Sequence, residues 1–215
     1  MLQRLRDSRD LFSSVCILTK SPGVLLDDPE YVACLKGTGV EVQVSIAFWR
    51  DSQSQMLEPG APPVSTRRQA VERLIEQGID VALRVDPLFP RGVAGCVEYQ
   101  SQEEDIAPLI QWAAAVGVLY VIASPLKQVY RRNRVQEFYD SLLPAFQTVR
   151  GAYRRMPEDL QHRLMSEMHE VCANNGLRLE HCFCNILKRN AGVPASYPSA
   201  EGKGNDPRPS RCLPA

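Results

Sequence analysis

The sequence predicts an α/β fold in which helices cover a parallel β-sheet, and three observations support this class. Short apolar runs with strand patterning alternate along the chain with segments whose apolar residues recur at helical spacing. Polar residues follow the ends of several apolar runs, which is where parallel strands present their chemistry. With 215 residues, 44% of them hydrophobic, the chain is long enough to bury one sizeable core.

Four strands are predicted in the first 125 residues. The first is a short apolar run that ends in Thr-Lys-Ser-Pro. The second alternates, with Val42, Val44 and Ile46 on one side, which is typical of a strand with two different faces. The third and fourth are continuous apolar runs. The four predicted strands lie at residues 15–18, 40–48, 81–85 and 116–123.

Helices are predicted between these strands. One apolar stripe covers residues 70–75 and ends near Gly78, and a second covers residues 106–114 and ends near Gly117. Because strands and helices alternate, the sheet is predicted to be parallel. Residues 49–63 are expected to form a long irregular loop, and such loops are often functional.

The remainder of the chain is predicted to be mainly helical. Residues 135–146 have one apolar face, and Pro157 opens a further helix that stops at the Asn-Asn-Gly of 174–176. A last short strand is predicted at 177–180. From residue 191 onward the sequence offers little to bury, so we expect one domain over 1–190 and a disordered tail over 191–215.

Composition excludes some classes of function. Twenty-five basic side chains balance 25 acidic ones, so the molecule has no strong overall field to attract nucleic acid or an anionic membrane. The apolar runs are far shorter than the roughly 20 residues that a membrane-spanning helix needs. Seven cysteines, an odd number, do not resemble a disulfide framework, and no signal peptide is evident. We expect a cytoplasmic protein with no membrane partner.

The polar residues after the predicted strands are the candidate functional site. Right-handed crossovers through the helices would place all four strand ends at one edge of the sheet. The residues expected to converge there are Lys20, Ser45, Arg84, Asp86 and Ser124.

Five clusters in order carry a resemblance to a known family. They are Ile-Leu-Thr-Lys-Ser, Val-Ser-Ile, Leu-Glu-Pro-Gly-Ala-Pro, Arg-Arg-Gln-Ala and Gly-Ile-Asp-Val-Ala-Leu-Arg-Val-Asp-Pro-Leu-Phe-Pro. Together they resemble the radical S-adenosylmethionine enzymes, specifically the spore photoproduct lyase-like branch, also called DNA repair photolyase-like. The resemblance covers residues 10–125. It implies a partial (βα) barrel of about four to five parallel strands, with a helical C-terminal region.

The resemblance also implies roles for four residues. Lys20 and Ser45 match positions that resemble cofactor contacts, Glu58 matches the Glu-Pro loop over the cofactor side, and Arg84 would face the lumen. An ammonium suits a carboxylate and a hydroxyl suits a ribose or carboxylate oxygen. Each residue also has a purely structural alternative. Lys20 could be an ordinary surface lysine, and Ser45 could be a small strand residue whose hydroxyl bonds to the backbone. Glu58 and Pro59 could form an ordinary turn before a helix that is capped by Ser65 or Thr66. Arg84 could form a structural ion pair with Asp86 or with Glu58.

The family's Cys-x3-Cys-x2-Cys motif, whose thiolates hold a 4Fe-4S cluster, does not occur in this sequence. We therefore expect no cluster and no metal site on this chain, and interpret it as a truncated or degenerate relative that is inactive alone. The catalytic residues stay unknown. Cys16 is expected inside a strand as an inert thiol. His181 with the pair Cys182 and Cys184 supplies too few ligands for a convincing metal site.

Several partners stay open. S-adenosylmethionine is the cofactor that the resemblance implies, and a nucleotide or phosphate metabolite is the alternative ligand. Arginines at 131–134, 150 and 154–155 could hold a nucleic acid backbone, although such arginines usually face water. A non-catalytic interaction module is the third hypothesis, because an unpaired first strand at 15–19 would invite self-association.

Overall fold

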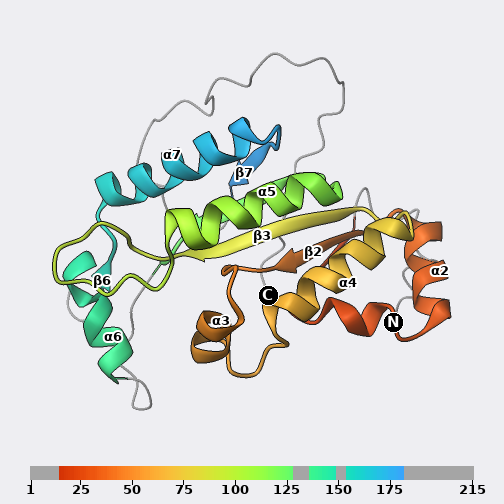
Figure 1. Ribbon diagram of the computed structural model, residues 1–215, viewed down its shortest axis with the longest axis horizontal. Helices are drawn as coiled ribbons and strands as arrows, with labels where there is room; N and C mark the ends of the chain where they lie inside the picture. The colour runs from red at the N-terminus through yellow and green to blue at the C-terminus, as the bar shows by residue number, and fades with distance from the viewer. Residues whose placement is uncertain (1–14, 128–135, 149–153, 182–215) are drawn as a thin grey trace.

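Five parallel strands form the central sheet of the computed structural model, in the order β1-β2-β3-β4-β7 (Figure 1). The structure describes residues 15–127, 136–148 and 154–181. The strands of this sheet are β1 (Cys16–Thr19), β2 (Glu41–Ser45), β3 (Val81–Leu88), β4 (Val121–Pro125) and β7 (Leu179–His181). A separate antiparallel pair joins β5 (Gln147–Thr148) to β6 (Arg154–Arg155).

Helices connect successive strands, which confirms the predicted α/β class. The α-helices are α2 (Pro29–Thr38), α3 (Asp51–Leu57), α4 (Val64–Glu76), α5 (Ala107–Val116), α6 (Gln136–Leu142) and α7 (Glu158–Asn174). Short turns of other helix types are η2 (Pro22–Leu25), the π-helical η3 (Gln102–Ile106) and η4 (Leu143–Ala145). None of the helices in the described residues is long and apolar enough to cross a membrane.

The register of the sheet gives its two faces different characters. Val44, Leu83 and Val121 lie side by side on three neighbouring strands, and all are fully buried in the main hydrophobic core. The next row contains Ser45 and Arg84, whose side chains point to the opposite face because strand residues alternate. One face is therefore apolar and the other carries polar groups.

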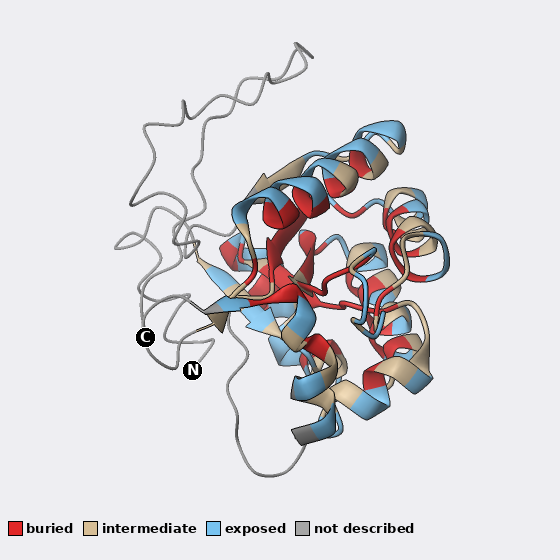
Figure 2. Cartoon of the chain, turned by 90° about the vertical axis from the view of Figure 1, so that its left-hand side faces the viewer, coloured by how far each residue is buried: buried red, intermediate tan, exposed pale blue. Residues whose placement is uncertain are grey.

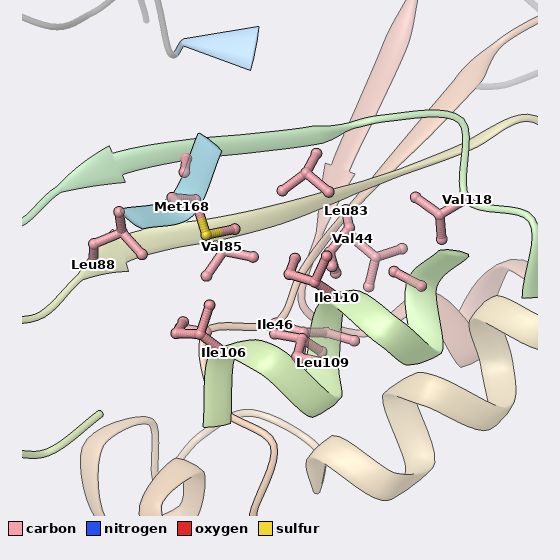
Figure 3. Packing of buried hydrophobic residues seen from close by; sticks show 14 of the residues in the cluster. Val44, Ile46, Leu83, Val85, Leu88, Ile106, Leu109, Ile110, Val118 and Met168 are labelled. Atoms are coloured by element: carbon pink, nitrogen blue, oxygen red, sulfur yellow. The ribbon is translucent and has the colours of Figure 1, made fainter. Parts of the chain in front are cut away.

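The helices pack on the apolar face. Figure 3 shows Leu109 and Ile110 of α5 and Met168 of α7 close to the valines and leucines of β2 and β3. The helices turn their buried faces towards the sheet and their exposed faces outward (Figure 2). Among the described residues the helices cover the apolar face, so the polar face is where we look for a binding site.

Two helices were missed by the sequence patterns. Helix α2 begins at Pro29, with Asp28 accepting a hydrogen bond from the Glu30 amide at 2.8 Å, and ends at Gly39, whose φ of 60° is left-handed. Its buried stripe is short, so its periodicity is weak. Helix α3 lies within residues 49–63, where an irregular loop was predicted. That prediction was wrong. The buried residue of this helix is the polar Ser54, so the sequence has no apolar stripe that would indicate a helix here.

Other boundaries also differ from the predictions. Strand β3 continues through Pro87 to Leu88, past the predicted end, and β4 begins at Val121 because α5 continues to Val116 and ends at Gly117, where φ is 87°. Cys16 lies in β1 as predicted, but the residue is exposed, so the expectation of a thiol made inert by burial in the strand was wrong. The last predicted strand, at 177–180, is present as β7 over Leu179–His181, and the helix predicted from Pro157 to 174–176 is confirmed as α7. The tail over 191–215 lies outside the described residues.

Candidate functional site

A pocket of about 340 Å³ opens at the carboxyl ends of β1, β2 and β3. Because these strands are parallel, their carboxyl ends meet at one edge of the sheet, as the sequence predicted. Ser124 joins the site from β4, with its hydroxyl donating to Asp86 Oδ1 at 2.7 Å. The residues that line the pocket are Leu18, Thr19, Lys20, Ser45, Arg84 and Asp86.

Arg84 is an almost buried cation in the wall of this pocket, with 5% of the residue exposed. Its guanidinium donates to Gln43 Oε1 at 3.1 Å and pairs with Asp86 Oδ2 at 2.9 Å. Of the two structural pairs considered for Arg84, the one with Asp86 forms. The pair with Glu58 does not, because Glu58 contacts other cations. Asp86 is thus held from both sides, by Arg84 and by Ser124.

Lys20 lines the pocket, and Glu58, which is not among the lining residues, forms an ion pair with it. Lys20 Nζ donates to Glu58 Oε1 at 2.7 Å, and the lysine side chain is 47% exposed whereas that of Glu58 is 9% exposed. Burial raises the pKa of Glu58, but hydrogen bonds and charge from Lys20 and Arg67 outweigh burial, so this pKa lies below its ordinary value. Glu58 therefore stays ionised at neutral pH.

Arg67 belongs to the Arg-Arg-Gln-Ala cluster quoted above, but the sequence analysis assigned it no role at the site. It lies on α4 and is fully buried. Its Nε donates to the Pro62 carbonyl at 2.8 Å, and its NH1 donates to the Ser45 carbonyl at 2.9 Å. Its NH2 donates to Ser54 Oγ at 2.6 Å and pairs with Glu58 Oε2 at 2.8 Å.

A signal for Arg67 was present in the sequence. It lies three residues after Val64 and four before Val71, both fully buried, so helical spacing places it on the apolar stripe of α4. A charged residue on such a stripe needs buried partners. Ser65, considered as the helix cap, instead donates to Asp51, and the capping position is Pro63.

Ser45 presents its hydroxyl to the pocket. The Ser45 carbonyl is bound by Arg67, but within the described part of the chain its hydroxyl has no hydrogen-bond partner. Since a hydroxyl can both donate and accept, this group is available to a ligand.

The polar face continues from the pocket towards the amino ends of the strands. Gln43 donates to Glu41 Oε1 at 2.9 Å, and the Tyr120 hydroxyl donates to the same oxygen at 2.6 Å. Burial, together with the hydrogen bond to Glu41, raises the pKa of Tyr120 well above its ordinary value. A connected chain of hydrogen bonds therefore runs from Tyr120 through Glu41, Gln43 and Arg84 to Asp86.

The described residues do not fit an iron-sulfur cluster. They contain no group of three histidine, cysteine or acidic side chains close enough to hold a metal ion. Of the predicted basic clusters, residues 131–134 and 150 lie outside the described ranges, and Arg154 with Arg155 forms β6. Cys182 and Cys184 also lie outside them.

These features define an open α/β half-barrel with a polar pocket at its strand ends. No family model matches the sequence. The chain is 30% identical over 104 residues to the uncharacterized protein ORF301 of Acidianus two-tailed virus, which corresponds to 48% of this chain and 32% of the viral protein.

Solved structures show the same fold. Streptococcus suis SuiB bound to S-adenosylmethionine aligns with a TM-score of 0.53 at 12% identity, over 84% of this chain and 33% of SuiB. A spore photoproduct lyase mutant with a dinucleoside spore photoproduct aligns with a TM-score of 0.56 at 13% identity, over 84% of this chain and 56% of the lyase. The predicted partial (βα) barrel is thereby confirmed as a fold that this chain shares with these proteins. The chain spans about a third of SuiB and about half of the lyase.

The ionised state of Glu58 can be tested by unfolding. Because its pKa is depressed in the folded state, its contribution to stability is present above its ordinary pKa of 4.5 and is lost as the pH falls further. We expect Glu58→Gln to lower the free energy of unfolding at pH 7 by about 3 kcal/mol, since it leaves buried Arg67 without its anion.

Urea unfolding between pH 3 and 7 should show this loss of stability shrinking as the pH falls. Glu76→Gln, at an exposed site of α4, is the matched control. A loss that does not change with pH would contradict the assignment.

Proposed function

We propose that the strand-end pocket binds S-adenosylmethionine. The observation that carries this proposal is the convergence of Lys20, Ser45, Arg84 and Asp86 in one pocket at the carboxyl ends of parallel strands. The fold likeness to SuiB, whose structure is bound to S-adenosylmethionine, supports the same ligand. Ligands of α/β sheets characteristically bind outside the carboxyl ends of the strands.

Each site residue has a role in this proposal. Lys20 binds the cofactor's carboxylate, and Glu58 beside it suits the ammonium of the same amino acid group. The Ser45 hydroxyl donates to a ribose or carboxylate oxygen. Arg84 orients Asp86, whose carboxylate accepts from ribose hydroxyls. Leu18, 57% exposed at the pocket, offers apolar surface.

The charge of the pocket favours this ligand over a phosphate metabolite. Lys20 is paired with Glu58 and Arg84 is paired with Asp86, so each cation near the pocket has an anion beside it. A phosphate would meet two carboxylates together with the two cations. S-adenosylmethionine carries charges of both signs, so it can exchange partners with these ion pairs.

We also propose that this chain does not generate a radical by itself. In the family that the sequence resembles, a reduced 4Fe-4S cluster cleaves the cofactor. The sequence lacks the Cys-x3-Cys-x2-Cys ligands, and the described residues supply no substitute. Radical chemistry, including a lyase reaction on a DNA lesion, would need a cluster supplied from outside this sequence. The nucleic acid partner rests on the likeness alone.

A cytoplasmic location is proposed from the cysteines. Cys96 and Cys172 carry thiols, and burial raises the pKa of Cys172 to about 12, which keeps that thiol unreactive. Persistent thiols are typical of a reducing compartment.

Isothermal titration calorimetry tests the ligand. We expect S-adenosylmethionine to bind the full chain and Lys20→Met to weaken binding at least about tenfold, since a charge-assisted hydrogen bond contributes roughly 1.5–3 kcal/mol. Lys36→Met is the matched control, because Lys36 donates to Gln77 away from the pocket. Inorganic phosphate should bind more weakly. Tighter binding of phosphate, or no binding of S-adenosylmethionine, would refute the proposal.

Iron analysis tests the absence of radical chemistry. After anaerobic reconstitution with iron and sulfide, we expect no stoichiometric cluster, because the ligand set is missing. A content of about four irons per chain, as a [4Fe-4S] cluster requires, would overturn this part of the proposal. The visible absorption spectrum provides a second readout, because an iron-sulfur cluster has charge-transfer bands that we expect to be absent.

Self-association is a second candidate function. Within the described residues β1 pairs with β2 on one side only, and it carries exposed Leu18. Such an edge can pair with another strand. If the edge is used, light scattering after size exclusion should give a mass that rises with concentration, and Leu18→Lys should lower that mass. A monomer at every concentration would rule the interaction out.

A further inference from the structure

Arg67 does not line the pocket, yet it contacts one lining residue, Ser45, and the ion-pair partner of another, Lys20. Through the Ser45 carbonyl it holds the end of β2, and through Ser54 and Glu58 it holds α3 and the turn that follows. A guanidinium is planar and its donors diverge at fixed angles, so it fixes its acceptors relative to one another. The position of Glu58 thus depends on α4.

The two oxygens of Glu58 are engaged separately. Oε1 accepts from Lys20 at 2.7 Å, and Oε2 pairs with Arg67 at 2.8 Å. The two cations differ in exposure, because the Lys20 side chain is half exposed and that of Arg67 is fully buried. If Lys20 moves away, Glu58 keeps the Arg67 guanidinium as its cation and a hydrogen bond from Ser54 Oγ at 3.4 Å.

We propose that Arg67 is a positioning residue that makes Lys20 exchangeable. By neutralising Glu58 from the buried side, it lets the Lys20 ammonium leave Glu58 and bind an anionic group of a ligand. The proposal deepens the proposed function and rests on it for the identity of the ligand, but the mobility of Lys20 can be measured without any ligand.

The loss of Arg67 has a definite electrostatic consequence. The charged groups around Glu58 are Lys20, in the segment after β1, and Arg67, on α4, while the Arg84–Asp86 pair lies at the pocket wall. Without Arg67, Lys20 is the remaining partner of a mostly buried carboxylate, so Glu58 holds it more tightly. The pKa of Glu58 should then rise, because burial is less well opposed.

Chemical acylation of Lys20 provides the test without ligand. A limiting amount of succinimidyl acetate labels lysine amines, and mass spectrometry gives the rate at Lys20 relative to Lys36. We expect Arg67→Gln, which keeps side-chain donors but removes the charge, to slow Lys20 acylation several-fold. Arg67→Lys should restore most of the rate. Arg68→Met, the neighbouring arginine that stacks on Trp49, is the matched control and should leave the rate unchanged.

Glu58→Gln, measured under conditions where it is folded, provides an independent variant of the same ion pairs. This variant removes the anion that retains Lys20, so Lys20 acylation should become several-fold faster than in the unmodified chain. An unchanged rate in Glu58→Gln would overturn the proposal. So would an unchanged rate in a folded Arg67→Gln variant, or an equal slowing in Arg68→Met.

The affinity for S-adenosylmethionine provides the second readout. Relative to the unmodified chain, Arg67→Gln should bind the cofactor at least about tenfold more weakly at pH 8 and recover affinity as the pH is lowered, because protonation of Glu58 releases Lys20. A purely structural role predicts a loss that does not depend on pH, and that result would refute the mechanism. If the unmodified chain binds no S-adenosylmethionine while Lys20 acylation follows the expected pattern, the proposed function is wrong and the role of Arg67 stands.

Discussion

The parallel pairing of β1, β2, β3, β4 and β7 is the constraint on which the rest of the structure depends. It aligns the carboxyl ends of the strands, so residues from distant parts of the sequence meet without any long insertion. It also fixes which residues share a face. A shift of one residue in β2 would exchange Ser45 with Val44, burying a hydroxyl among the helices and removing it from the pocket.

The charged side chains of the polar face are stabilised by ion pairs with one another rather than by contact with water. Arg84 and Arg67 are both nearly or fully buried, and each has a carboxylate within 3 Å. Removing one partner from such a pair typically costs about 3–5 kcal/mol of folding free energy, because the other charge is left uncompensated. The ion pairs that compensate these buried charges therefore also fix the positions of Ser45, Glu58 and Asp86.

Much of this arrangement could be predicted from local patterns. Apolar runs located the strands. Lys20, Ser45 and Arg84 follow or lie near the ends of these strands, and they could be predicted to be neighbours because the carboxyl ends of parallel strands lie at one edge of the sheet. Helix α3 could not be found this way, since it forms through long-range contacts such as the bond from Ser65 to Asp51. The partners of Arg67 are equally remote, with Ser45 lying 22 residues before it in the chain.

The side-chain amide of Gln43 links an acidic and a basic residue of the polar face, and its orientation is fixed by them. Its amide nitrogen donates to Glu41 and its oxygen accepts from Arg84, so the two ends of this neutral group meet an acid on one side and a base on the other. Rotating the amide by half a turn would set donor against donor and acceptor against acceptor. Gln43 thus bridges the Glu41 carboxylate, which also accepts from Tyr120, and the Arg84 guanidinium in the wall of the pocket, and it gives each charge a hydrogen-bond partner of the matching kind.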